Sequence, residues 1–271
     1  MTQVDPFGQF KAAQREGWSL FAPMETGTAI PAGELVRFAG IAAGERVLDV
    51  GSGTGVVAVT AAKAGARVDG LDLTPALVER ARQNSALADV PVSFVEGDAE
   101  ALPYPDASFD VVVSQFGHMF APRPEVAISE MLRVLRPWGR IAFSTWPPDH
   151  YVGRFFNALR RHTPTPLPGA PVPAPPSQWG DPEVVRARLG DAVMNLTFAW
   201  GEMVAPALSP EHVRAAMEST IGPLARLMDA LRPAPDRLEK LRSEILALAR
   251  EYWRDNQMRQ VFLMSRAIKR A

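Results

Sequence analysis

The sequence predicts an α/β protein built around a mostly parallel sheet, and three observations lead to this fold class. A strand-like run, Val47–Val50, enters the glycine turn Gly51–Gly55, and a helix-like run, Val56–Ala64, follows it. Strand-like and helix-like segments then alternate as far as residue 146. Two of the strands end in acids, Asp72 and Asp98. Such alternation is typical of βαβ units, whose right-handed crossovers produce a parallel sheet.

Composition fits one globular domain, residues 1–271, and excludes several classes of site. Hydrophobic residues make up 47% of the 271 residues, which is ample for a core. The net charge of −1 gives no electrostatic case for nucleic acid or an acidic membrane as a partner. Because the chain has no cysteine, it has no disulfide, thiolate zinc site or cysteine nucleophile. No other cluster with metal-ligand spacing stands out, so we expect no metal.

The apolar segments of the sequence indicate where the protein is located. Residues 1–10 carry Asp5 and no apolar run, so we expect no signal peptide. No run of about 18 apolar residues is present, so we expect no membrane insertion. We therefore expect a cytoplasmic protein.

The N-terminal region, residues 1–30, is expected to form an amphipathic helix. Its larger side chains step by three or four residues, as an apolar helix face does: Phe7, Phe10, Gln14, Trp18 and Phe21. This face either packs on the domain or covers the glycine turn as a lid. A short helix over residues 32–39 follows and ends before Gly40.

The remaining elements are predicted in chain order. Strands are expected at residues 66–73, 92–98, 109–114, 140–146, 193–204 and 260–268, and helices after Thr74-Pro75, after Pro124, and at 183–189, 209–232 and 236–254. Residues 163–176 are half proline and form either a linker or a packed loop at the mouth of the site. The apolar stripe of 236–254 suits packing or a dimer interface, so a monomer or a homodimer is expected.

The glycine turn can be assigned to a ligand by its spacing. A dinucleotide site needs Gly-x-Gly-x-x-Gly, but the glycines fall at 51, 53 and 55 and position 56 is valine. Asp49 would repel a pyrophosphate, whereas it suits a cationic amine. Asp72 can accept two ribose hydroxyls, and Asp98 can accept the amine of an adenine flanked by Leu73 and Ala99. These groups describe S-adenosylmethionine, with NAD as the alternative.

Residues 45–146 resemble the class I S-adenosylmethionine-dependent methyltransferases, in particular the group similar to the ubiquinone/menaquinone C-methyltransferases. The resemblance is carried by Val-Leu-Asp-Val-Gly-Ser-Gly-Thr-Gly (47–55), Gly-Leu-Asp-Leu-Thr-Pro (70–75), the segment 96–110, and Glu-Met-Leu-Arg-Val-Leu-Arg-Pro-Trp-Gly (130–139). It implies that Gly51, Ser52, Gly53 and Gly55 cradle the cofactor. It also implies that Asp72 holds ribose, that Asp98 and Ala99 contact adenine, and that Ser114, Gln115 or Phe116 lines the methionine side.

The resemblance also implies a Rossmann-like, doubly wound sheet of seven strands, mostly parallel, with an antiparallel last strand. Residues 31–146 would be the cofactor-binding core. Residues 147–180 would be a proline-rich cap loop and residues 205–258 a helical cap insertion, which with the N-terminal lid would cover the substrate. Trp138 departs from the family, which usually has glycine there, and lies away from the expected site.

Methyl transfer requires an acceptor atom in line with the methyl group and a site without water, and it requires a base only if the acceptor must lose a proton. His118, after the fourth strand, is the candidate base; alternatively it lines the pocket without transferring a proton. His150, His162 and His212 are expected in solvent. An apolar acceptor pocket is expected from Trp18, Phe21, Phe116, Met119, Phe120, Trp146 and Tyr151.

The expected function is methyl transfer to a small, partly apolar acceptor at O, N or C. The chain lacks the Asn/Asp-Pro-Pro-Tyr of DNA amino-methyltransferases and the cysteine of pyrimidine C5-methyltransferases. A non-catalytic S-adenosylmethionine-binding regulator and an NAD-dependent dehydrogenase are the alternatives. An open cavity beside the methyl group would favour an enzyme, and a filled one would favour the regulator.

Overall fold

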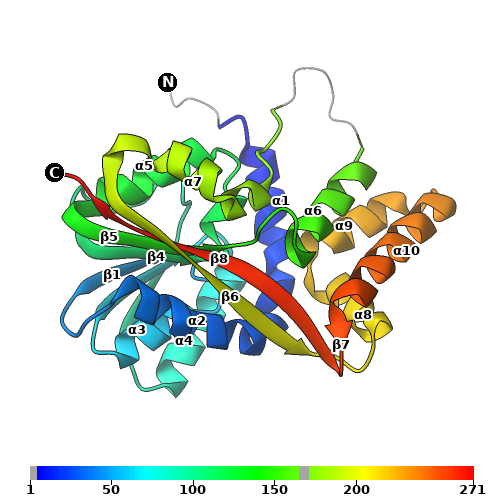
Figure 1. The fold of residues 1–271 in the computed structure, drawn as a ribbon, viewed down its shortest axis with the longest axis horizontal. Coiled ribbons are helices and arrows are strands. Elements are labelled where there is room, and N and C mark those ends of the chain that lie inside the picture. The colour runs from blue at the N-terminus through cyan, green and yellow to red at the C-terminus, as the bar shows by residue number, and fades with distance from the viewer. Residues whose placement is uncertain (1–4, 165–170) are drawn as a thin grey trace.

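A computed structural model of the protein describes residues 5–164 and 171–271 and places an eight-stranded sheet at its centre (Figure 1). The strand order is β3-β2-β1-β4-β5-β8-β6, and the short β7 pairs with β8. The strands are β1 Arg46–Val50, β2 Arg67–Asp72, β3 Val92–Glu96, β4 Phe109–Gln115, β5 Leu135–Thr145, β6 Val193–Pro206, β7 Trp253–Arg254 and β8 Gln257–Lys269. β1 to β5 pair in parallel, and β8 is antiparallel to both β5 and β6. The α/β fold class and the antiparallel last strand are confirmed.

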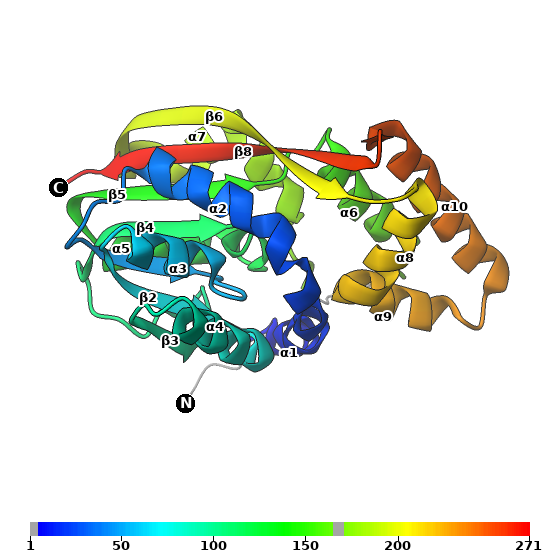
Figure 2. The same ribbon diagram turned by 90° about the horizontal axis from the view of Figure 1, so that it is seen from below.

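Helices cover both faces of the sheet because its strands are apolar on both sides. In β1, Val47 packs with α2 (Glu25–Ala39), α3 (Val56–Lys63) and α4 (Pro75–Leu87) on one face. Leu48 and Val50 pack with α5 (Pro124–Val134) and α7 (Pro182–Leu189) on the other face. Figure 2 shows α2, α3 and α4 together on one side of the strands. Near-continuous apolar strands of this kind are typical of parallel sheets that are buried on both faces.

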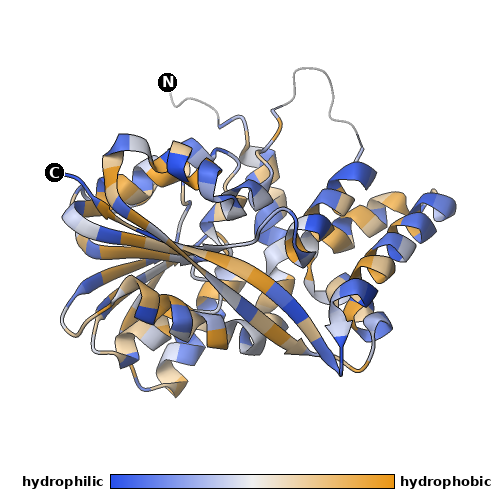
Figure 3. Ribbon diagram, viewed as in Figure 1, coloured by the Kyte–Doolittle hydropathy of each residue, from blue (hydrophilic) through white to orange (hydrophobic). Residues whose placement is uncertain are grey.

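The helices start where the sequence supplies start signals. Proline occupies the first turn of α4, α5, α7, α8 (Pro210–Thr220), α9 (Gly222–Leu231) and α10 (Pro235–Tyr252). At this position proline loses no helical hydrogen bond, because the N–H that it lacks would have no partner within the helix. The helices of the core are α2 Glu25–Ala39, α3 Val56–Lys63, α4 Pro75–Leu87, η2 His118–Phe120, α5 Pro124–Val134, η3 Pro176–Gly180, α7 Pro182–Leu189 and η4 Gly190–Ala192, and the N-terminal ones are α1 Gly8–Gly17 and η1 Trp18–Met24. Figure 3 shows both hydrophobic and hydrophilic residues on these helices, as amphipathic packing requires.

A second group of helices lies at one end of the sheet and is called the cap. It consists of α6 Tyr151–His162, α8 Pro210–Thr220, α9 Gly222–Leu231 and α10 Pro235–Tyr252. The cap has its own apolar cluster, which includes Phe155, Leu224 and Leu241. A long ribbon of β6 and β8 connects it to the core: β5 pairs with β8 only from Leu263 onward, whereas β6 pairs with β8 from Gln257 (Figure 1).

The structure corrects several predicted elements. Residues 147–180 were predicted as a loop, but α6 occupies 151–162. The helix predicted at 209–232 is two helices, because Gly222-Pro223 interrupts it. The helix predicted at 32–39 begins at Glu25 and so crosses the boundary placed after residue 30. β5 starts at Leu135 rather than residue 140.

Two predicted segments lie partly outside the residues that the structure describes. The proline-rich segment 163–176 includes residues 165–170, and the lid region 1–30 includes residues 1–4, which lie outside the described residues. Across residues 5–164 and 171–271, no helix combines the length and apolar character needed to cross a membrane.

Candidate functional site

The glycine turn lies at the carboxyl end of β1, where the strand order reverses between β2 and β4. Such switch points are the usual ligand sites of open α/β sheets. Gly51 has φ +67°, and a Cβ there would lie 2.8 Å from Cα of Gly117. Only glycine fits this close approach, so the turn can pass beneath the loop that follows β4.

Asp49 is buried beside this turn and has an unsatisfied oxygen. Its Oδ2 accepts the backbone N–H of Ala58 at 3.1 Å and so caps the first turn of α3 from outside the helix. Its Oδ1 has no hydrogen-bond partner among the described residues. Burial raises its pKa to about 7, with a contribution from the charge of Asp72. A buried carboxylate of this kind favours a cationic ligand group.

Asp72 holds the turn from the end of β2. Its carboxylate accepts the backbone N–H of Gly53 at 2.8 Å and that of Thr74 at 2.9 Å. Burial raises its pKa, although both hydrogen bonds oppose the shift. Each carboxylate oxygen retains capacity to accept another hydrogen bond, so the geometry leaves room for two hydroxyls.

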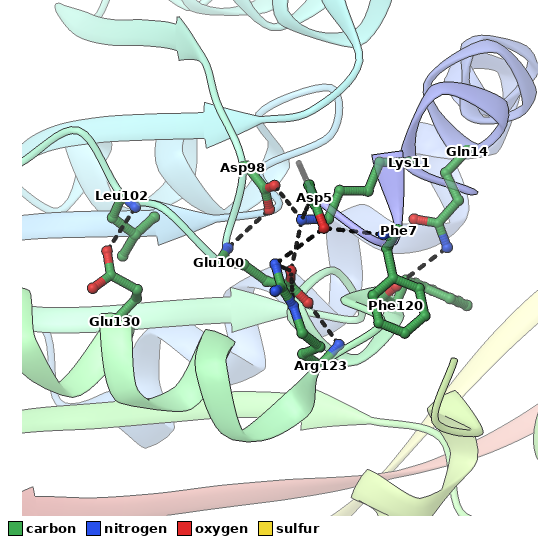
Figure 4. Close-up of polar contacts among 10 residues, drawn as sticks. All are labelled: Asp5, Phe7, Lys11, Gln14, Asp98, Glu100, Leu102, Phe120, Arg123 and Glu130. Carbon is green, nitrogen blue, oxygen red and sulfur yellow. Dashed lines mark hydrogen bonds and ion pairs between the residues drawn. The ribbon is translucent and has the colours of Figure 1, made fainter. Parts of the chain in front are cut away.

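At the next strand end, Asp98 belongs to an ion network with the N-terminal helix (Figure 4). The Nζ of Lys11 lies 2.7 Å from Asp5, 2.7 Å from Asp98 and 2.6 Å from Glu100. Arg123 binds the same Glu100 carboxylate at 2.7 and 2.9 Å. The Lys11 ammonium therefore lies at the centre of the three acids, and the network ties α1 to the loop after β3.

The N-terminal segment, α1 with η1, reaches from the core to the cap. Gln14 donates to the carbonyl oxygen of Phe120 at 3.2 Å, and the rings of Trp18 and Phe120 lie 4.7 Å apart (centroids). At the far end of α1, a Cβ on Gly222 of α9 would lie 2.1 Å from the backbone oxygen of Gly17. The two backbones therefore touch, which holds α1 against the cap.

These elements line a cavity of about 660 Å³, within the usual range of about 300–1,000 Å³ for small-molecule sites. Its core half, formed by lining residues 49–122, carries Asp49, Asp72 and Asp98. Its cap half, formed by lining residues 146–260, carries no Asp, Glu, Lys or Arg among the described residues. The polar side chains of the cap half are Trp146, Tyr151, His212 and Gln260, and the apolar ones include Phe155, Phe156, Met203, Val213, Met217, Ile221 and Met258.

Most of the predicted cofactor residues line this cavity. They are Asp49, Gly51, Ser52, Gly53, Asp72, Leu73, Asp98, Ala99 and Gln115. Gly55 and Ser114 are not lining residues. At Gly55 a Cβ would meet the ring of Phe94 at 2.8 Å, so this glycine permits helix–strand packing. Ser114 donates to the carbonyl oxygen of Val50 at 2.6 Å and thereby fastens β4 to β1.

Two further buried acceptors beside the turn lack partners. Gln115 donates through Nε2 to the carbonyl oxygen of Thr28 at 2.8 Å, but its Oε1 has no partner among the described residues. The Oγ of Ser52 likewise has none in that part of the chain. With Oδ1 of Asp49, the site thus holds three unsatisfied polar oxygens. Buried polar atoms are normally paired, so their state indicates a ligand with several donors.

His118 does not line the cavity, contrary to its expected role. Its ring lies 4.6 Å from that of Phe143 and 4.7 Å from that of Trp179 (centroids), and only 1% of the residue is exposed. Neither ring nitrogen has a partner among the described residues. Burial, with the nearby charge of Arg188, lowers its pKa to about 3. Because the imidazole is enclosed and weakly basic, it is not placed to take a proton from an acceptor.

The other predictions for the acceptor side are mixed. Trp18, Phe21, Phe116, Phe120, Trp146 and Tyr151 line the cavity as expected, but Met119 is buried in the core. His212 is exposed as expected, yet it also lines the cavity, and His150 is half-buried. His162 is buried rather than solvated, and its Nε2 lies 2.8 Å from Glu244.

Sequence reasoning missed Lys11 and Gln260. Lys11 stands four residues after Phe7 and seven before Trp18, so helical spacing places it on the same face. An amphipathic pattern identifies only the apolar residues of that face, so it does not single out a lysine. Gln260 begins a strand that was correctly expected. Nothing in the local sequence indicates that this end of the strand extends past β5 toward the cap.

Comparison with known proteins matches residues 48–143 to the family described as "Methyltransferase domain". An uncharacterised protein of Mycobacterium tuberculosis (strain H37Rv) is 33% identical over 99% of this chain and 100% of its own length. The demethylmenaquinone methyltransferase of Deinococcus radiodurans is 41% identical over 105 residues, which is 38% of this chain and 44% of that protein.

A solved structure extends the likeness to the fold. A phosphoethanolamine N-methyltransferase of Haemonchus contortus, in complex with phosphomonomethylethanolamine and S-adenosylhomocysteine, superposes with a TM-score of 0.52. The match covers 89% of this chain and 52% of that one at 16% identity, so it concerns the fold alone.

Proposed function

Since this chain belongs to the class I S-adenosylmethionine-dependent methyltransferases, we propose that it methylates a small, largely apolar acceptor held in the cap half of the cavity. The observation that carries the proposal is the continuity of the cavity. One continuous space is lined by the glycine turn and its acids at one end and by aromatic and methionine side chains at the other. A polar donor site and an apolar acceptor site therefore share a wall near Gln115 and Phe116.

The residues of the core half suit S-adenosylmethionine. Oδ1 of Asp49, Oγ of Ser52 and Oε1 of Gln115 are the unsatisfied polar oxygens there, and they suit an α-ammonium, which only donates. Asp72 would hold the ribose hydroxyls. Asp98, whose Oδ2 lies 2.7 Å from Lys11 and whose Oδ1 accepts the backbone N–H of Glu100 at 2.9 Å, would accept the adenine amine as an additional hydrogen bond. Leu73 and Ala99 would lie against the ring. The dehydrogenase alternative is dropped, because the family assignment gives S-adenosylmethionine as the cofactor.

The protein's contribution to the reaction is placement and exclusion of water. When bound, the cofactor would supply a methyl group on a sulfonium, with S-adenosylhomocysteine as the leaving product and any proton of the acceptor atom passing to water. The turn and Asp72 fix the donor end, while Phe116, stacked on Trp146 at 3.9 Å (centroids), forms the wall beside it. The rigid walls favour an in-line approach, and the apolar cap half excludes competing water.

We propose that the N-terminal segment acts as the lid of this site. It touches the core through Lys11 and Gln14 and the cap through Gly17, and it lines the cavity with Trp18 and Phe21. We expect this segment to move away from the cavity when ligands exchange.

An open cap half favours an enzyme over a purely regulatory binding protein, and a plug can test this. Ala215 and Ala216 are both exposed, but only Ala216 lines the cap half. We expect Ala216→Trp to abolish methyl transfer from labelled S-adenosylmethionine to a library of neutral hydroxy and amino compounds. S-adenosylhomocysteine should still bind within about twofold of the wild-type affinity, since the core half is unchanged.

The matched variant Ala215→Trp should retain transfer. Transfer that persists in Ala216→Trp would place the acceptor elsewhere. Absence of transfer in the wild type across the whole library, with S-adenosylhomocysteine bound normally, would favour the regulator.

A further inference from the structure

Gln260 is the one side-chain amide among the described residues of the cap half, and it lines the cavity. The residue is 8% exposed, and its amide atoms are not among the fully buried atoms that lack a partner. Water in the ligand-free cavity can therefore bond the carboxamide. A ligand that displaces this water must offer the amide a donor and an acceptor in its place.

The position of Gln260 makes the amide conspicuous. It lies on the part of β8 that extends past β5, paired with Met203 of β6. Met258 and Phe262 are its neighbours on the same face of the strand, since side chains alternate along it. The carboxamide is therefore set in an apolar wall and has no structural role in the sheet.

The other polar side chains of the cap half interact with neighbouring residues of the protein. The hydroxyl of Tyr151 donates to Sδ of Met217 at 2.8 Å, and Nδ1 of His212 lies 3.0 Å from the hydroxyl of Ser209. Trp146 has its ring stacked on Phe116. Gln260 alone offers both an acceptor and two donors on one side chain, within a chamber whose described walls carry no Asp, Glu, Lys or Arg.

We propose that Gln260 is the specificity-determining residue for the acceptor, and that the acceptor is an uncharged, mainly apolar molecule with a donor and an acceptor on one edge, such as an amide or a hydroxyl beside a carbonyl. This inference rests on the proposed function. An anion would lose its hydration in this chamber without meeting a cation, so the site rejects carboxylates. The paired hydrogen bonds of the carboxamide orient the neutral edge.

Three matched probes separate these claims: 3-hydroxy-2-naphthamide, which is neutral and has the edge; 3-hydroxy-2-naphthoate, an anion; and 2-naphthol, which is neutral without the edge. Calorimetry on protein loaded with S-adenosylhomocysteine should show the naphthamide binding at least about tenfold more tightly than the naphthoate. Gln260→Met should weaken the naphthamide about tenfold and leave 2-naphthol within about twofold. Gln257→Met, on the same strand but outside the cavity, should change neither.

Stability gives a second readout that needs no acceptor. Because the carboxamide faces the cavity, Gln260→Met should not lower the Tm of the ligand-free protein. A lower Tm would reveal a structural partner and overturn the proposal. Equal binding of naphthamide and naphthoate, no loss in Gln260→Met, or no binding of any probe would also overturn it. Failure of S-adenosylhomocysteine to bind at all would instead contradict the proposed function.

Discussion

The core half of the cavity is polar and is built from the ends of parallel strands, whereas the cap half is apolar and is built from helices and the β6–β8 ribbon. In our proposal, backbone geometry and three carboxylates of the core half bind the cofactor. The shape of the cap half and one amide would select the acceptor. A site for a fixed cofactor can be recognised in the sequence as a short motif of glycine turns and acids. A site for the acceptor cannot, because its walls come from segments that lie far apart in the sequence.

The difference predicts that losses in the core half will be large and specific to the cofactor, and Asp72 should give the largest. Asp72→Asn removes a charged acceptor from both the ribose site and the turn. We expect the dissociation constant of S-adenosylhomocysteine to rise about 100-fold, as lost charge-assisted bonds imply. Calorimetry measures this directly. Asp69→Asn, on the same strand but outside the cavity, is the control and should bind normally; normal binding by both variants would remove Asp72 from the site.

Asp49 predicts that cofactor binding in the core half depends on pH. Its pKa of about 7 in the ligand-free protein means that the carboxylate ionises as pH rises through 7, whereas binding of a cation requires the ionised form. Affinity for S-adenosylhomocysteine should therefore rise from pH 6 to pH 8. Asp49→Asn should bind about tenfold more weakly at pH 8, and its affinity should be almost independent of pH in this range. A wild-type affinity that is constant across this range would contradict the assignment.

The same group predicts an opposite effect on stability. A carboxyl whose folded-state pKa is raised destabilises the fold progressively as pH rises from its ordinary 3.8 to about 7 and fully above that. Without cofactor, Asp49→Asn should thus stabilise the protein above pH 7 by up to about 4 kcal/mol and hardly at all near pH 4. Urea unfolding at the two pH values checks the sign.

Lys11 connects the two halves through the lid, and its effect should be smaller. Lys11→Met leaves Asp98 and the buried Glu100 without their shared cation, so α1 should detach more often. We expect hydrogen exchange in residues 8–24 to quicken about tenfold, with S-adenosylhomocysteine bound several-fold more weakly. Lys63→Met, on exposed helix surface in α3, serves as the control. Unchanged exchange would show that the apolar contacts alone hold the lid.

His118 should give the smallest effect on catalysis. Its ring is enclosed between Phe143 and Trp179, and the pKa of about 3 keeps it neutral at physiological pH. His118→Leu replaces an unpaired buried imidazole by an apolar group of similar size, which is often close to neutral for stability. The pH dependence of kcat should remain that of the wild type. A lost limb in the pH profile would restore His118 as a base.

The sequence was informative where backbone chemistry is local. The glycine spacing, the acids at strand ends and Thr74-Pro75 predicted the parallel core and nearly all of the core half. The role of His118 could not be predicted because this residue lies three positions beyond the end of β4, in the short helix η2, where a side chain can point to either side of the sheet. The sequence predicts the cap helices α8, α9 and α10 within residues 209–254 but not α6, because the segment that holds α6 is marked by its prolines. The place of Gln260 on the cavity wall depends on how far β8 extends past β5.

The most direct test of the central claim, that one cavity holds the donor at its polar half and the acceptor at its apolar half, is a crystal structure with S-adenosylhomocysteine bound. We predict the adenine between Leu73 and Ala99, the ribose on Asp72, and the sulfur facing the cap half past Gln115, with that half still open beside Gln260. A sulfur that faces solvent, or a cap half closed by its own side chains, would contradict the account.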